Sequence, residues 1–196
     1  MDRDARGSDE SLSGPGSTME DTLGFRAQLP NFIKEQNIRS VLDAPCGDWR
    51  WMNSVELGVE RYIGADIVAP LVESLQREHG GPGREFRRLD VICDPLPDVD
   101  AILCRDLLIH LPNALGVEAL RNFQRSKARW LFTTTYTEID ENVECHLGGF
   151  RPVNLTLQPF SLLAPIALIR EGLGGQEPHL GRSLGIWELP ARPVRS

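Results

Sequence analysis

The chain has 196 residues, a length that suits one domain with a single continuous core. Its 21 basic and 28 acidic residues give a net charge of −7, the wrong sign for binding a phosphate backbone, so we expect no nucleic acid partner. No apolar run approaches the roughly 18 residues of a membrane span and no export signal begins the chain, so we expect a soluble, cytoplasmic protein without membrane contact.

The first 17 residues are almost entirely charged, Gly, Ser or Pro, and Leu12 is their only large apolar side chain besides the initiator. Such a segment cannot offset its own ordering entropy, so we expect a flexible tail at 1–17 and a single domain at 18–196. Ser17 and Glu20 form a capping-box pattern that predicts a helix start. An apolar stripe at helical spacing follows, and Pro30 is expected to split it into two short helices. The stripe consists of Leu23, Phe25, Leu29, Phe32 and Ile33.

Five short apolar runs then predict five strands, and the gaps between the first three are long enough for a crossover helix in each. Another helix is predicted at 115–126, after Pro112. Alternating strands and helices indicate a Rossmann-like α/β domain, with a mostly parallel sheet and helices on both faces. The five predicted strands cover 40–44, 61–67, 85–91, 100–106 and 129–136.

The alternation stops after Tyr136. Residues 137–160 show little periodicity and predict a long loop, which in a compact domain is usually functional or disordered. Residues 165–172 and 183–190 predict two last strands that form an antiparallel hairpin at one edge of the sheet.

The four cysteines form no CxxC pair and have no histidine at zinc-finger spacing. We therefore predict no metal site and no disulfide framework, but free thiols in a reducing cytosol. The acidic run at 140–142 is not assigned to a metal either, because magnesium needs oxygen ligands that converge from distant segments.

In an open parallel sheet, ligands bind outside the carboxyl ends of the strands. Asp43 ends the first predicted strand and Gly47 lies in the turn after it, while Asp66 and Asp90 end the second and third strands. Asp66 follows Gly47 by 19 residues, the spacing at which an acid accepts the hydroxyls of a ribose. An aspartate at this position is also a common cap of the next helix, so both interpretations remain.

The order VLDAPCG, YIGADI, RRLDV, AILCRD resembles the class I S-adenosylmethionine-dependent methyltransferases over about residues 20–190. It is also similar to a small bacterial subgroup that pairs an LDAPCGD–WM loop with CRD and a downstream HL. The resemblance implies that Asp43 and the backbone around Cys46 and Gly47 hold the methionine moiety of the cofactor. It further implies a ribose at Asp66 and Ile67, an adenine at Asp90 and Val91, and an ammonium at the main chain of Cys104 and Arg105.

The usual loop of this superfamily reads acid-x-Gly-x-Gly-x-Gly, and here only the middle glycine, Gly47, is present. Pro45 and Trp49 occupy the outer positions, and Trp49 is expected to form a wall of the cofactor site. The shortage of glycine argues against a dinucleotide, whose pyrophosphate needs a glycine-rich cradle. S-adenosylmethionine has no pyrophosphate, so the missing glycines matter less for it.

His110 is the candidate general base and follows Asp106 by four residues. If this stretch is helical, the carboxylate lies on the same face and orients the imidazole; the other interpretation is a structural histidine. Arg105 either holds a substrate carboxylate or phosphate or pairs with a neighbouring acid. Arg151 and Asn154 are further candidates for substrate contacts. Tyr136 would line the substrate and sulfonium pocket, although core packing is its alternative role.

These features predict an enzyme that moves a methyl group from S-adenosylmethionine to a small molecule, at oxygen rather than nitrogen. The N-terminal helices and the 137–160 loop are expected to roof the pocket, and the loop would close on substrate. Two alternatives remain. One is a methyltransferase-fold enzyme that catalyses a rearrangement or elimination, and the other is a module that binds the cofactor without catalysis.

Overall fold

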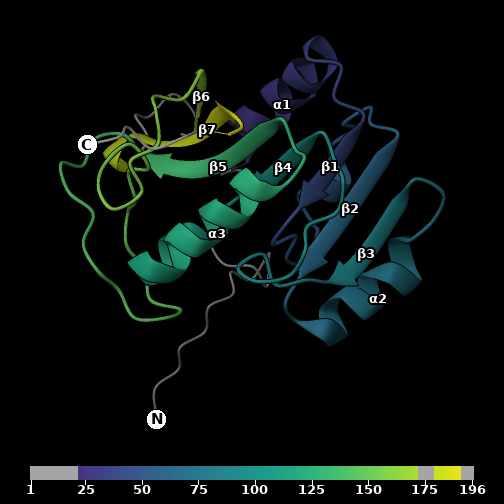
Figure 1. The fold of residues 1–196 in the computed structure, drawn as a ribbon. Helices are drawn as coiled ribbons and strands as arrows, with labels where there is room; N and C mark the ends of the chain where they lie inside the picture. Colours follow the sequence, from purple (N-terminus) through teal and green to yellow (C-terminus); the bar gives the residue numbers. More distant parts are fainter. Residues whose placement is uncertain (1–21, 172–178, 191–196) are drawn as a thin grey trace.

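The computed structural model describes residues 22–171 and 179–190. Within them, seven strands form one sheet in the order β3-β2-β1-β4-β5-β7-β6 (Figure 1). The first five strands are parallel, whereas β7 runs antiparallel to both of its neighbours. The predicted mostly parallel sheet is confirmed. The strands are β1 Ser40–Asp43, β2 Arg61–Asp66, β3 Arg84–Arg88, β4 Ala101–Cys104, β5 Trp130–Tyr136, β6 Ala167–Arg170 and β7 Arg182–Glu188.

Three α-helices cover the sheet: α1 Leu23–Glu35, α2 Ala69–His79 and α3 Asn113–Arg125. Side chains alternate between the two faces of each strand, so neighbouring residues enter different cores. Val41 and Tyr62 pack with α1 and α2, whereas Leu42 and Ile63 pack with α3. Figure 1 shows α3 lying across the near face of the sheet. The prediction of helices on both faces is therefore confirmed.

The predicted split of the first helix is wrong. The residues from Leu23 to Glu35 form one helix with Pro30 inside it. A proline in a helix interior costs about 3 kcal/mol, but Phe25, Leu29 and Ile33 bury the same face of this helix against the sheet. Burying each such side chain contributes about 1.5–3 kcal/mol, which outweighs the proline. The capping box at Ser17 and Glu20 and the tail at 1–17 lie outside the described residues.

The predicted crossover helix between the first two strands is also wrong. Only a 3₁₀ turn at Met52–Ser54 forms there, because the connection is built around large side chains that fill the core directly. Trp51 packs edge-on against Phe25, with ring centroids 4.8 Å apart, and Met52 is fully buried. The crossover helix between β2 and β3 forms as expected, as α2.

The C-terminal hairpin is confirmed, and β6 lies at the sheet edge while β7 separates it from β5. Residues 137–160 contain no helix or strand, as predicted. They are nevertheless firmly attached, since Val153 and Leu155 are fully buried in the core beneath α3. No helix of the described ranges is both long and apolar enough to cross a membrane.

Candidate functional site

A cleft of about 480 Å³ opens at the carboxyl ends of the parallel strands. This volume lies within the usual range for a small-molecule site. Each of the first four strands contributes its exit to the wall, and the long loop adds Leu147. The residues that line it after the strands are Ala44 and Pro45, Asp66 and Ile67, Asp90 and Val91, and Leu107 and Leu111. Four of the predicted cofactor residues are thus brought together: Asp66, Ile67, Asp90 and Val91.

The turn after β1 is tied to the end of β2. The Cys46 N–H donates to the Ala65 carbonyl at 2.8 Å, and the Gly47 N–H donates to Oδ2 of Asp66 at 3.3 Å. Gly47 has φ +54°, in the left-handed region that glycine adopts without steric cost. The single glycine of the loop therefore lies where the backbone requires one.

Asp66 makes hydrogen bonds to the backbone just before α2, and its role toward a ribose stays a prediction. Its Oδ1 accepts the Val68 N–H at 3.0 Å, at the start of α2, while the carboxylate also forms part of the cleft wall. Each carboxylate oxygen has two acceptor sites, so each retains capacity for a hydroxyl donor. Ile67 beside it is 55% exposed and places an apolar side chain at the cleft.

Asp90 and Val91 form the wall after β3. Oδ1 of Asp90 accepts the Ile92 N–H at 2.9 Å, which shapes the backbone of this turn. Val91 is almost fully buried and adds an apolar side chain to the cleft lining. Nearby Cys104 is completely buried, and burial raises the pKa of its thiol above the usual range. The Cys104 side chain is therefore closed to a ligand, and the contact implied for its main chain stays a prediction.

Asp43 lies beneath the turn and outside the cleft lining. It is 1% exposed and accepts a hydrogen bond from the Tyr62 hydroxyl, a partner that sequence reasoning missed. Burial raises the pKa of Asp43 to about 7, although the Tyr62 hydrogen bond and the Arg105 charge oppose this shift. Asp43 thus supports the turn from below, and a contact to a ligand would have to come through the backbone above it.

Trp49 is placed differently from the expectation. Its φ of +56° directs the chain so that the indole packs with Phe86, at 5.0 Å between ring centroids, and with Tyr62 at 6.0 Å. The Arg84 guanidinium lies 4.8 Å from the same ring. Trp49 therefore belongs to the core beneath α1 and α2 and is absent from the cleft lining.

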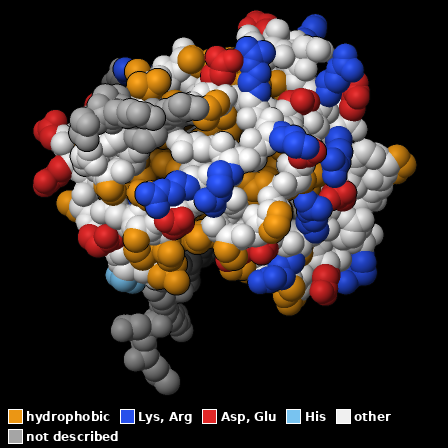
Figure 2. All heavy atoms as spheres, in the orientation of Figure 1, with side chains coloured by type: hydrophobic (Ala, Val, Ile, Leu, Met, Phe, Trp, Pro, Cys, Tyr) orange, Lys and Arg blue, Asp and Glu red, His pale blue; other side chains and the backbone are white. Residues whose placement is uncertain are grey.

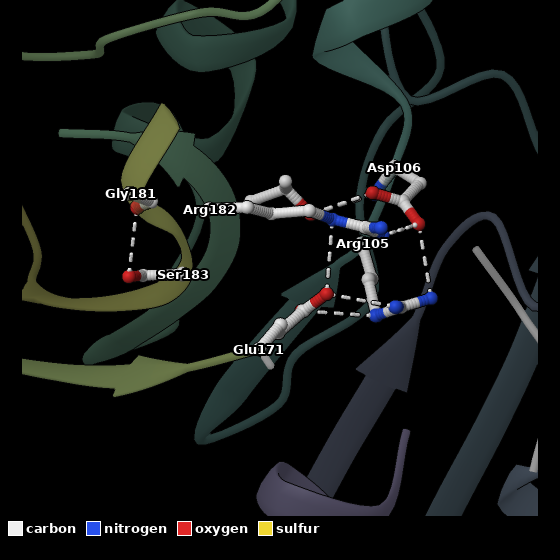
Figure 3. A network of polar contacts seen from close by, with 7 residues as sticks. Arg105, Asp106, Glu171, Gly181, Arg182 and Ser183 are labelled. Atoms are coloured by element: carbon white, nitrogen blue, oxygen red, sulfur yellow. Dashed lines mark hydrogen bonds and ion pairs between the residues drawn. The ribbon is translucent and has the colours of Figure 1, made fainter. Parts of the chain in front are cut away.

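A network of four charged side chains, two buried and two partly buried, joins the exits of β4 and β6 to the start of β7 (Figure 3). Arg105 pairs with Glu171 at 2.9 Å and with Asp106 at 3.0 Å. Arg182 pairs with Asp106 at 2.7 Å and with Glu171 at 3.1 Å. The two positive and two negative charges of this network balance one another. Of the two roles predicted for Arg105, the structure shows the pairing with acids. Glu171 and Arg182 carry no recognisable sequence signal, because their partners lie far away in the chain.

This network keeps Asp106 ionised. Burial by itself would raise the pKa of Asp106, but the charges of Arg105 and Arg182 and the Thr134 hydrogen bond hold it below its usual range. The carboxylate therefore acts as a fixed anion and does not exchange protons near neutral pH. Tyr136 lies beside the same charges and is 3% exposed; burial raises its pKa, so its hydroxyl stays protonated.

His110 is oriented by the long loop rather than by Asp106. Asp106 has φ +55° and only a 3₁₀ turn, Leu108–His110, follows it, so the predicted helical face does not form. Instead, Nδ1 of His110 lies 2.7 Å from the Gly149 carbonyl oxygen. A carbonyl only accepts hydrogen bonds, so Nδ1 carries the hydrogen and the neutral ring has its lone pair on Nε2.

Arg151 and Asn154 secure the long loop. The Arg151 guanidinium donates to the Leu108 carbonyl at 3.1 Å, the Leu111 carbonyl at 2.8 Å and Oδ1 of Asn113 at 2.7 Å. Asn154 accepts hydrogen bonds from both the backbone and the hydroxyl of Thr156 through its Oδ1. Nε of Arg151 is buried without a hydrogen-bond partner, and neither residue is in the cleft lining, so their predicted substrate contacts stay predictions.

The predicted roof forms only in part. Leu147 of the 137–160 loop lines the cleft, but α1 packs on the opposite side of the sheet from α3, with Phe25, Leu29 and Ile33 in that core. The loop is held to the rest of the domain by buried hydrogen bonds of Arg151 and by its buried apolar side chains. The loop thus contributes Leu147 to the cleft lining, and α3 contributes Leu115.

No protein-family model matches the chain, and no curated protein matches it. Solved structures do resemble it. The N-methyltransferase NodS from Bradyrhizobium japonicum WM9, in complex with S-adenosyl-L-homocysteine, is 13% identical with a TM-score of 0.64, over 89% of this chain and 90% of NodS. PigF with SAH is 15% identical with a TM-score of 0.60, over 85% of this chain and 55% of PigF.

The methyltransferase domain of bacterial CtHen1 is 12% identical with a TM-score of 0.52, over 60% of this chain and 68% of that domain. At this level of identity, the likeness concerns the fold. The chain has the Rossmann-like fold of methyltransferases, with the mixed seven-stranded sheet described above.

Proposed function

We propose that the protein binds S-adenosylmethionine in the cleft and transfers its methyl group to a small molecule, at oxygen rather than nitrogen. The observation that carries the proposal is the cleft itself. It lies where the parallel strands end, and it combines the Asp66 carboxylate with apolar walls from Ile67 and Val91. A nucleoside needs this combination, because its hydroxyls require an acceptor and its base requires flat apolar surfaces.

The residues present fit this cofactor. Asp66 would accept the ribose hydroxyls through the acceptor sites left beside its two backbone hydrogen bonds. Ile67 and Val91 would contact the adenine, with Asp90 at its polar edge. The backbone of Cys46 and Gly47, and the main chain at Cys104 and Arg105, would hold the methionine end. These assignments follow the resemblance in sequence. Asp66, Ile67, Asp90 and Val91 line the cleft, whereas the four residues assigned to the methionine end are not among its lining residues.

The cofactor supplies a methyl group that sulfonium activates for displacement, so the protein has to align the acceptor and remove its proton. We assign the removal of the acceptor's proton to His110, because Nδ1 of its ring donates to the Gly149 carbonyl and the lone pair on Nε2 remains available. Asp106 stays an anion between two arginines, which leaves His110 as the candidate for the proton. A base serves a neutral hydroxyl, whereas a neutral amine already has its lone pair, and this favours oxygen as the acceptor atom.

Calorimetric titration with S-adenosylhomocysteine tests the binding step. Wild-type protein should bind it, and Asp66→Ala should lose at least tenfold in affinity. Asp98→Ala is the matched control, because the Asp98 side chain lies in an exposed ion pair with Lys127, and this variant should bind the ligand as wild type does. Absence of binding to wild type, or unchanged affinity in Asp66→Ala, would refute the cofactor assignment.

A second experiment separates transfer from binding alone and from other chemistry. The protein is incubated with methyl-labelled cofactor and an extract of small molecules, and the label is followed into products. A labelled product that requires the intact protein supports methyl transfer. Cofactor binding without any labelled product would favour the non-catalytic module, and consumption of an acceptor without label would favour a rearrangement or elimination.

A further inference from the structure

Two large apolar side chains of the long loop are exposed, Leu147 at 66% in the cleft lining and Phe150 at 61% beside His110. We call them the apolar loop patch. Leu147 itself lines the cleft, so the patch continues the apolar cleft wall formed by Leu107 and Leu111. Figure 2 shows hydrophobic side chains gathered on the side of the molecule where Figure 1 draws this loop.

The patch and His110 form one rigid unit. The His110 imidazole lies 6.1 Å from the Phe150 ring, between centroids. The Gly148 N–H donates to the His110 carbonyl at 2.8 Å, and the Arg151 N–H donates to the Ile109 carbonyl at 3.1 Å. These hydrogen bonds hold the loop against the turn after β4, so the Phe150 ring and the His110 imidazole lie side by side.

The charges near the patch do not suit an anionic ligand. The loop stretch 139–151 contains three acids and, apart from one histidine, a single cation, Arg151. The Arg151 guanidinium is buried and donates to three oxygens of the protein. A carboxylate or phosphate bound here would lose its hydration without gaining a free positive partner, which is costly.

We propose that the acceptor is a neutral, apolar phenol, whose ring packs on the apolar loop patch and whose hydroxyl meets Nε2 of His110. This inference rests on the proposed methyl transfer and specifies its substrate class. A phenol suits a histidine base, since the pKa of a phenolic hydroxyl is about 10 and an alcohol holds its proton far more strongly. In the step, the phenol oxygen bonds to the methyl carbon, the phenolic proton moves to Nε2, and the electron pair of the broken carbon–sulfur bond stays on sulfur.

A matched set of probes tests the substrate class: 4-propylphenol, its carboxylate analogue 3-(4-hydroxyphenyl)propionate, 4-propylaniline and 4-propylcyclohexanol. Methylation is followed with labelled S-adenosylmethionine. We expect kcat/KM for 4-propylphenol to exceed that for every other probe at least tenfold. His110→Gln, which keeps a donor for the Gly149 carbonyl, should lower kcat at least a hundredfold while S-adenosylhomocysteine affinity stays the same.

The patch is tested by Phe150→Ser, with Leu168→Ser as control, because Leu168 is also exposed but lies on β6 at the sheet edge. Phe150→Ser should raise KM for 4-propylphenol at least fivefold with kcat within twofold, and Leu168→Ser should change neither. An NMR titration of 4-propylphenol into protein saturated with S-adenosylhomocysteine measures binding without turnover, and Phe150→Ser should weaken it by a similar factor.

Several results would overturn the inference. These are equal turnover of the carboxylate or the amine, unchanged kcat in His110→Gln, or a protein that binds S-adenosylhomocysteine yet neither binds nor methylates the phenol. A dimer in sedimentation that Phe150→Ser dissociates without affecting phenol kinetics would assign the patch to a second copy of the chain. Failure to bind S-adenosylhomocysteine at all would instead refute the proposed function, so the two failures are distinguishable.

Discussion

Replacing Arg151 by methionine should destabilise the protein, because it removes the hydrogen bonds that attach the long loop to the turn after β4. The side chain is 2% exposed and donates to two backbone carbonyls and to Asn113. Hydrogen bonds from a charged group contribute about 1.5–3 kcal/mol each. Burial, however, lowers the pKa of Arg151, which shows that the buried charge carries a desolvation cost. We therefore expect a net loss of about 3 kcal/mol rather than the full sum.

Urea unfolding and thermal unfolding measure this loss. A decrease of about 3 kcal/mol corresponds to a fall in Tm of roughly 6–12 °C for a chain of this size. Arg151→Lys keeps one donor group and should lose about half as much. Arg125→Met is the control, because Arg125 is exposed at the end of α3 and should change stability by less than about 0.5 kcal/mol.

The same variant should bind S-adenosylhomocysteine several-fold more weakly, since the Leu111 carbonyl that Arg151 holds belongs to a residue of the cleft wall. An unfolding free energy equal to that of wild type, combined with a raised KM for the acceptor, would refute the reasoning. That result would mean that Arg151 contacts the substrate, as the sequence alone suggested.

Three further predictions concern the scaffold. Burial raises the pKa of Asp43 to about 7 from an ordinary value near 3.8. The stability that protonated Asp43 contributes is therefore full below pH 4 and is lost as the pH rises through 7. Asp43→Asn cannot ionise, so its free energy of unfolding in urea should rise relative to that of wild type between pH 4 and 8. Pro30→Ala should raise the unfolding free energy by about 1–2 kcal/mol, because it restores an N–H for the Arg26 carbonyl within α1; no change in Tm would contradict this. Gly64→Ala should lower the unfolding free energy by about 1–3 kcal/mol, because the added Cβ would overlap the Phe86 ring. An unfolding free energy equal to that of wild type would show that the ring moves aside.

Local patterns predicted most of the scaffold. Short apolar runs marked β1 to β5 within one to three residues at each end, because strands buried on both faces need continuous apolar stretches. The predictions that failed were those in which packing outweighed local preference. Pro30 stays inside α1 since one helix face is buried, and the connection around Trp51 and Met52 fills the core without an α-helix.

In the candidate site, too, some residues could be predicted from the sequence and others could not. Asp66 and Asp90 were found because strand exits in a parallel sheet meet at one edge, a property of topology that sequence spacing already reflects. The hydrogen bonds of Arg151 to three oxygens of the protein could not be predicted, because a loop arginine looks the same in sequence whether it faces solvent or the protein interior. Tyr62, Glu171 and Arg182 were missed since each acts through a partner that is distant in the chain.

The sequence by itself determined the fold class, the cleft at the strand exits and the acids Asp66 and Asp90 that line it, since these depend on the order and spacing of residues along the chain. Only the tertiary structure decided that Asp106 is a fixed anion, that the Gly149 carbonyl sets the hydrogen on His110, and that Trp49 lies away from the cleft. Charge balance, tautomer and side-chain direction depend on which distant segments meet, and that is decided only when the whole core packs.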